Sequence, residues 1–208
     1  VLFRSVTLDW LQSGLVETLG VVKVCCVEEE KKVDGEPQFD PETESWIPTQ
    51  QMVTKKRFEV MPIPSEEFLF SPRMKSLEDR CYKAHCVSKT LSDLVEMGFD
   101  RETVEGLPTV DREYDGDARH SSRWRDNNWI DRQREGASRE VMLFEEYDYL
   151  DIDGDGVTEL VRCFRVEDVL LSVEEWEEQP FVGFCPYPRA HRLVGKGLAE
   201  KVMPDQRV

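Results

Sequence analysis

The chain has 208 residues, of which 39% are hydrophobic and 34% are charged, and its formal net charge at pH 7 is −16. This composition is sufficient for a buried core, but the excess of carboxylates excludes a freely soluble nucleic-acid binder, which needs a basic face to displace counterions from phosphate. The apolar runs are far shorter than the roughly 20 residues that a membrane-spanning helix needs.

The first element predicted along the chain is a short helix over residues 7–19. Three leucines recur there at helical spacing, and Gly20 follows as a residue that ends helices. The leucines are Leu8, Leu11 and Leu15.

A set of antiparallel strands is predicted next. Residues 21–27 are rich in β-branched side chains, and residues 46–47 and 55–61 look like returning strands after turns that contain Asp, Gly and Pro. We expect the prolines of the segment 62–64 to end these strands, because proline donates no hydrogen bond to a ladder. Residues 1–62 are therefore predicted to form a helix followed by a β-meander.

A strand and a capped helix are predicted within residues 63–110. The strand covers residues 82–87. Thr90 is a good N-cap, and Asp93, three residues later, approximates a capping box with Asp in place of Glu. Gly98 then stands where a glycine commonly ends a helix, and a shorter helix should follow.

The second half of the chain separates into three parts. Residues 111–140 are dominated by Arg, Asp, Asn, Ser and Gly, which predicts a long polar loop. Residues 141–198 form a part rich in β-hairpins, with one strand pair joined by an Asp/Gly turn near residues 151–156. Residues 199–208 look like the start of a further element that is cut short. Because Val1 is not an initiator Met, we also expect the chain to begin inside a longer reading frame. The predicted fold class is α+β, antiparallel and β-rich, with a few short helices.

The cysteines do not form a recognisable metal or redox motif. No Cys-x-x-Cys pair occurs, and no histidine stands at a zinc-ligand spacing from them. We therefore expect reduced, mostly buried thiols, with the two adjacent cysteines on opposite faces of a strand. The six residues are Cys25, Cys26, Cys81, Cys86, Cys163 and Cys185.

The most specific local motif is an acidic turn. Asp151, Asp153 and Asp155 stand at the first, third and fifth positions of an EF-hand loop, but position twelve is Arg162 instead of a bidentate Glu, and both flanks look like strands. Two interpretations remain. The turn uses Asp and Gly because they tolerate positive φ, or it also binds Ca²⁺ through the three aspartates and Glu159.

No catalytic site is predicted. The chain has no Gly-rich phosphate loop, nucleophile elbow or HExxH motif. Clustered carboxylates could suggest an acidic-site hydrolase, but a hairpin tip is poorly placed to exclude water, and no second acidic group with a histidine partner supports that function. We expect a protein that is not an enzyme and requires no cofactor.

Several of these pieces occur in a fixed order that resembles the P22-like portal proteins of podoviruses. The ordered set covers roughly residues 8–207. Its parts are Met61–Pro72, Ser76–Asp79 with Ala84-His85, Thr90–Asp100, Glu145–Tyr147 followed by Asp151–Leu160, Pro180-Phe181, Pro186–His191, Gly195–Gly197 and Asp205–Arg207.

This resemblance implies the wing region of a portal subunit, up to the point where the chain enters the stem. Subunits of this family form a homo-oligomeric ring of about twelve copies, the head-to-tail connector at one capsid vertex. The resemblance also implies capsid and scaffolding proteins, terminase and tail adaptor proteins as partners of the full-length chain. Double-stranded DNA would pass through the channel during packaging and ejection, without sequence recognition.

The implied location is the virion, after assembly in the host cytoplasm and without a membrane. An acidic subunit suits a DNA conduit, since like charge lets the duplex slide. Two other functions stay open at this point: a cation-binding, β-rich virion or adhesion module and, with less support, the hydrolase.

Overall fold

The computed structural model describes residues 2–35, 38–40, 45–47, 50–108 and 136–203. Most of the predicted polar loop and the last five residues lie outside this part of the chain. In chain order the elements are α1 Leu2–Glu17, β1 Gly20–Asp34, β2 Gln38–Asp40, β3 Ser45–Ile47, β4 Gln50–Ile63, η1 Ser65–Glu67, β5 Phe68–Phe70, β6 Lys83–Thr90, α2 Leu91–Glu96, α3 Arg101–Glu105, η2 Gly136–Ser138, β7 Glu140–Leu150, β8 Glu159–Val166, β9 Val169–Glu175, β10 Phe181–Phe184 and α6 Leu198–Val202.

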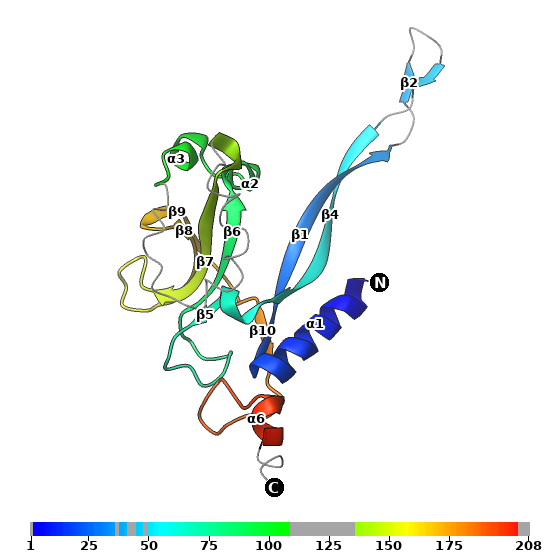
Figure 1. Ribbon diagram of the computed structural model, residues 1–208. Helices are drawn as coiled ribbons and strands as arrows, with labels where there is room; N and C mark the ends of the chain where they lie inside the picture. The colour runs from blue at the N-terminus through cyan, green and yellow to red at the C-terminus, as the bar shows by residue number, and fades with distance from the viewer. Residues whose placement is uncertain (1, 36–37, 41–44, 48–49, 109–135, 204–208) are drawn as a thin grey trace.

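The larger body is an antiparallel sheet in the order β5-β6-β7-β8-β9. Its central strand β7 alternates between inward and outward side chains, as a strand with one buried face should. The short helices α2 and α3 cover one end of this sheet (Figure 1). There Leu94 and Val104 are fully buried against strand residues such as Val166. The predicted α+β class with antiparallel sheets is confirmed.

The second sheet extends into a long arm. Its order is β10-β1-β4, but β10 pairs only with Gly20–Lys23, at the base. β1 and β4 pair with each other without a register shift from Val21↔Ile63 to Asp34↔Gln50. We call residues 24–34 and 50–60 the arm. Figure 1 shows it projecting away from the five-stranded sheet, with β2 at its far end.

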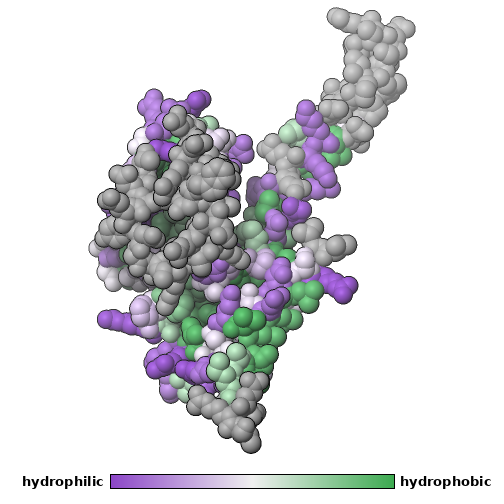
Figure 2. All heavy atoms as spheres, in the orientation of Figure 1, coloured by the Kyte–Doolittle hydropathy of each residue, from purple (hydrophilic) through white to green (hydrophobic). Residues whose placement is uncertain are grey.

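Helix α1 lies against the base of the arm (Figure 1). The indole nitrogen of Trp10 donates to the carbonyl oxygen of Gly20 over 3.0 Å, and its ring meets Phe184 edge-on at 6.2 Å. A helix is confirmed here, but it covers Leu2–Glu17 instead of residues 7–19. Gly20 begins β1 and does not end the helix, because the chain already turns at Thr18, whose φ is 82°. The leucines themselves face solvent, with Leu8 56% exposed, and Figure 2 shows hydrophobic side chains gathered over this helix.

The core between the two sheets is built from aromatic and aliphatic side chains. Phe181 lies edge-on to both Phe68 and Tyr147, at ring distances of 5.1 and 5.4 Å. Leu19 and Val21 reach this cluster from the base of the arm. Tertiary packing of these side chains, more than local propensity, holds the arm's base on the larger sheet.

One local prediction is confirmed in part, and another needs correction. The prolines of the segment 62–64 do end β4, which stops at Ile63 before Pro64, although Pro62 itself still pairs with Val22. An edge strand tolerates proline where the ring nitrogen points away from the neighbouring strand. The six thiols are free, but only Cys86 is buried, four are half-buried and Cys26 is exposed.

The predicted ends of α2 are confirmed. Thr90 and Asp93 form the reciprocal capping box of α2, with both hydrogen bonds present. Gly98 follows this helix with φ at 96°, in the left-handed region that glycine adopts without steric cost. The start of a further element near residue 199 is the helix α6.

Candidate functional site

The acidic turn connects β7 to β8. Asp151 accepts hydrogen bonds from the backbone N–H groups of Gly154 (2.6 Å) and Gly156 (3.0 Å). Both glycines have positive φ. Glu159, at the start of β8, accepts from the N–H of Ile152 over 3.3 Å. The predicted hairpin turn with strand flanks is therefore present, and it differs from the helix-flanked loop of an EF-hand.

Three of the four predicted ligands lie close together. One carboxylate oxygen from each of Asp151, Asp153 and Glu159 lies within 4.8 Å of the others. Asp155 is not in this group, and its carboxylate accepts from the N–H of Val157 over 2.7 Å. Hydrogen bonds to the turn's own amides give these carboxylates a structural role, and Ca²⁺ binding by the first three stays a proposal.

The turn offers no enclosed space for catalysis. Residues 151–158 are exposed, so a substrate there would remain in water. Within the described residues, this turn is where carboxylates gather closely enough to hold a metal ion. The turn therefore does not form the concave cluster of carboxylates that the hydrolase interpretation requires.

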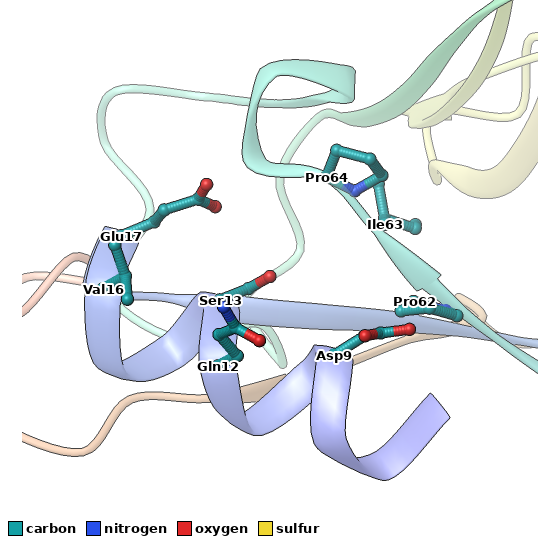
Figure 3. A pocket seen from close by; sticks show the side chains of 8 residues that line it. All are labelled: Asp9, Gln12, Ser13, Val16, Glu17, Pro62, Ile63 and Pro64. Atoms are coloured by element: carbon teal, nitrogen blue, oxygen red, sulfur yellow. The ribbon is translucent and has the colours of Figure 1, made fainter. Parts of the chain in front are cut away.

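The pocket shown in Figure 3 lies between α1 and the end of β4. It has a volume of about 380 Å³. Asp9 and Glu17 bring carboxylates to it, and Glu17 accepts a hydrogen bond from the hydroxyl of Ser65 over 2.6 Å. The remaining lining is Gln12, Ser13, Val16, Pro62, Ile63 and Pro64. This lining brings no histidine, cysteine or basic side chain to the carboxylates, so it lacks an acid–base pair.

A buried ion pair joins the two sheets, and the sequence did not reveal it. The ammonium of Lys23 on β1 contacts the carboxylate of Glu145 on β7, with side chains only 9% and 11% exposed. The hydroxyl of Tyr147 donates to the same carboxylate over 2.7 Å. Two partners therefore satisfy a charge that would otherwise be costly to bury.

The surroundings of Glu145 set its ionisation. Burial alone would raise the pKa of Glu145, but the positive charge of Lys23 and hydrogen bonds from Lys23 and Tyr147 lower it below its ordinary value. Burial, together with the negative charge of Glu145, raises the pKa of Tyr147. Glu145 is thus ionised at neutral pH, while the Tyr147 hydroxyl keeps its proton and stays a donor.

A second charged cluster lies on the neighbouring positions of the same sheet. Glu146 accepts from the guanidinium of Arg165 over 2.6 Å and from the hydroxyl of Tyr82 over 2.8 Å. Burial opposes ionisation of Glu146, yet these partners lower its pKa. The two glutamates of β7 therefore each have a partner, on opposite faces of one strand.

One feature of the sequence could have identified Glu145. The inward positions of β7 are Val141, Leu143, Glu145 and Tyr147, so a carboxylate stands among side chains that all belong to a core face. A charge at such a position needs a partner. The partner, Lys23, lies more than a hundred residues away in the sequence, so only the tertiary structure identifies it.

Comparison with known proteins identifies the family. A family model described as "Phage SU10 portal protein" matches residues 47–208, well over half of the chain. The chain belongs to this phage portal family. The resemblance to a portal protein is thereby confirmed. A search of curated proteins finds no match.

Membership in this family gives the general context of the chain. The family match places the chain among the portal proteins of phage capsids. None of the described helices combines the length and hydrophobicity needed to cross a bilayer.

Proposed function

We propose that this chain forms the wing of a portal subunit, and that copies of it assemble into a closed ring of about twelve at one capsid vertex. The ring serves as the head-to-tail connector through which double-stranded DNA enters during packaging and leaves during ejection. The family match over residues 47–208 carries this proposal. The role is structural, without catalysis.

The charge of the chain supports a conduit over a DNA-binding role. A formal charge of −16 repels the phosphate backbone, so a duplex would move past the ring without being held. Carboxylates of the acidic turn and of the segment that follows β9 are solvent-exposed. Their exposure fits an outer surface that stays soluble and does not capture DNA.

The partners follow from the same proposal. The full-length protein would contact capsid and scaffolding proteins during assembly in the host cytoplasm, terminase during packaging and tail adaptor proteins afterwards. The described residues include none that sequence motif or geometry assigns to DNA or terminase, so these contacts are proposed for the protein as a whole.

Imaging of the full-length protein tests this function. We expect negative-stain electron microscopy of the purified protein to show closed rings, and mass measurement to give about twelve copies. The control is the same preparation under dissociating conditions, which should return monomers and lose the rings. A protein that stays monomeric at every concentration would contradict the proposal.

A second function is tied to the acidic turn. The close approach of Asp151, Asp153 and Glu159 would allow a cation-binding β-rich module. That function requires stability to rise with Ca²⁺, since a cation relieves the repulsion between neighbouring carboxylates. A melting temperature that does not respond to chelator would leave the turn with only its structural role.

A further inference from the structure

The arm leaves two strand edges without a neighbour among the described residues. On the β1 side, β10 covers Gly20–Lys23, and one further hydrogen bond joins the N–H of Val24 to the carbonyl of Pro180 over 2.9 Å. On the other side, β4 is the last strand of the sheet. A two-stranded ribbon is marginally stable alone, and open edges are templates for pairing with another chain.

The register shows which backbone groups face outward. Because Val24 donates to Pro180, its N–H points away from β4. In an antiparallel ladder this direction alternates, so even-numbered residues of β1 face outward, and so do their partners on β4, which are also even-numbered. Pro62 fits this pattern, since its nitrogen is on the outer side of β4. Thr54 and Lys56 thus present free backbone groups at the outer edge.

The two strands of the arm differ in charge. Counted by sequence, residues 24–34 carry a net charge of −2 and residues 50–60 a net charge of +2. The side chains of Lys55, Lys56 and Arg57 on β4 are exposed, and Lys56 pairs with Glu28 of its own copy over 2.7 Å. The arm holds five basic and five acidic residues, although the whole chain has a net charge of −16. Arms of two copies can therefore approach without net repulsion, and the basic edge of one fits the acidic edge of another.

An exposed aromatic side chain lies on the same ribbon. Phe58 is 80% exposed and stands directly opposite Cys26, which is exposed too. The charges of Lys55, Lys56 and Arg57 would oppose pairing with a neutral or basic strand, but they suit a neighbouring strand that carries an excess of glutamates. A strand added beside β4 would cover part of the Phe58 ring and remove this apolar area from water.

We propose that the β4 edge of one copy pairs with the β1 edge of a second copy, so that one antiparallel sheet continues from arm to arm around the ring. This inference rests on the proposed ring. In each copy β1 runs from the base of the arm to its far end, and β4 runs back to the base. If the ring axis is parallel to the arm, rotation therefore brings β1 of the next copy beside β4 in antiparallel orientation. If the copies are not shifted along this axis, Lys56 of one copy would lie opposite Glu28 of the next, and the outward backbone groups of these two residues would face each other.

Thr54→Pro in the full-length protein tests the pairing. Proline at this position removes an outward N–H but no hydrogen bond to β1, so the monomer should keep its fold and melting temperature. We expect the concentration needed for ring formation to rise at least tenfold. Thr54→Ala, which removes the side chain and keeps the N–H, is the matched control and should assemble like the parent.

Hydrogen exchange gives a second, independent measurement on the parent protein. Amides of the even-numbered residues within 50–60, which face outward, should exchange at least tenfold more slowly in rings than in monomers. Rings of Thr54→Pro at the parental concentration, or unchanged exchange on assembly, would overturn the pairing. Protection that appears only on addition of duplex DNA would overturn it too, by assigning the basic strand to DNA. A parent that forms no rings counts instead against the proposed function.

Discussion

Replacing Glu145 by Gln tests the ion pair between the two sheets. The substitution keeps the shape of the side chain and removes its charge, which leaves the Lys23 ammonium buried without a counterion. Both side chains are about nine-tenths buried, so water can solvate the ammonium only poorly. Breaking a buried pair on one side costs about 3–5 kcal/mol, the magnitude we expect here.

A second substitution separates the pair from general damage. The double variant Lys23→Met/Glu145→Gln leaves no charge at either position of the buried pair, and the amide oxygen of the new Gln can still accept from the hydroxyl of Tyr147. Replacing both partners of a buried pair is often close to neutral. We therefore expect the double variant to recover most of the stability lost in Glu145→Gln.

Urea or thermal unfolding of purified protein measures both effects. In a chain of this size about 1 kcal/mol corresponds to roughly 2–4 °C, so Glu145→Gln should lower the melting temperature by roughly 10 °C. Glu105→Gln is the control, because the Arg101–Glu105 pair lies outside the arm, its side chains are 77% and 62% exposed, and its loss should change stability little. Equal losses in the single and double variants would refute the reasoning.

The remaining predictions concern pH, capping and metal. Folding lowers the pKa of Glu145 from its ordinary 4.5, so the stability that this carboxylate contributes is present above pH 4.5 and is lost as the pH falls through the lower pKa of the folded state. Glu145→Gln should therefore reduce the loss of unfolding free energy at acid pH. An unchanged dependence on acid pH would contradict the assignment. Thr90→Ala should cost about 1 kcal/mol through loss of the α2 cap, whereas Thr90→Ser should cost little. If the acidic turn binds Ca²⁺, adding it should raise the melting temperature, and Asp151→Asn should remove that response; no response in the parent would rule out the cation.

The acidic turn shows how far local sequence could lead. Asp and Gly at residues 151–156 predict a hairpin, because these residues form turns whichever core lies beneath. The path of the loop between β7 and β8 then decides which carboxylates meet. It brings one oxygen each of three carboxylates within 4.8 Å of one another, while Asp155 accepts from a backbone amide instead. The sequence proposed four ligands, and the geometry brings three together.

Helix α1 shows where a periodic pattern is ambiguous. The spacing of Leu8, Leu11 and Leu15 predicts a helix but does not say which face is buried. In the fold, the opposite face with Trp10 and Gly14 packs on the arm's base, because a small residue and an indole donor fit there. The surface against which the helix packs therefore determines which of its two faces is buried.

The sequence by itself determined the local elements of this protein, since caps, turns and alternating strands depend on neighbours a few residues away. It also determined the family, through motifs in a fixed order. Only the tertiary structure decided that β10 returns to β1, that Lys23 meets Glu145 across two sheets and that the arm keeps open edges. These features depend on contacts between distant segments, and local patterns carry no information on which segments meet.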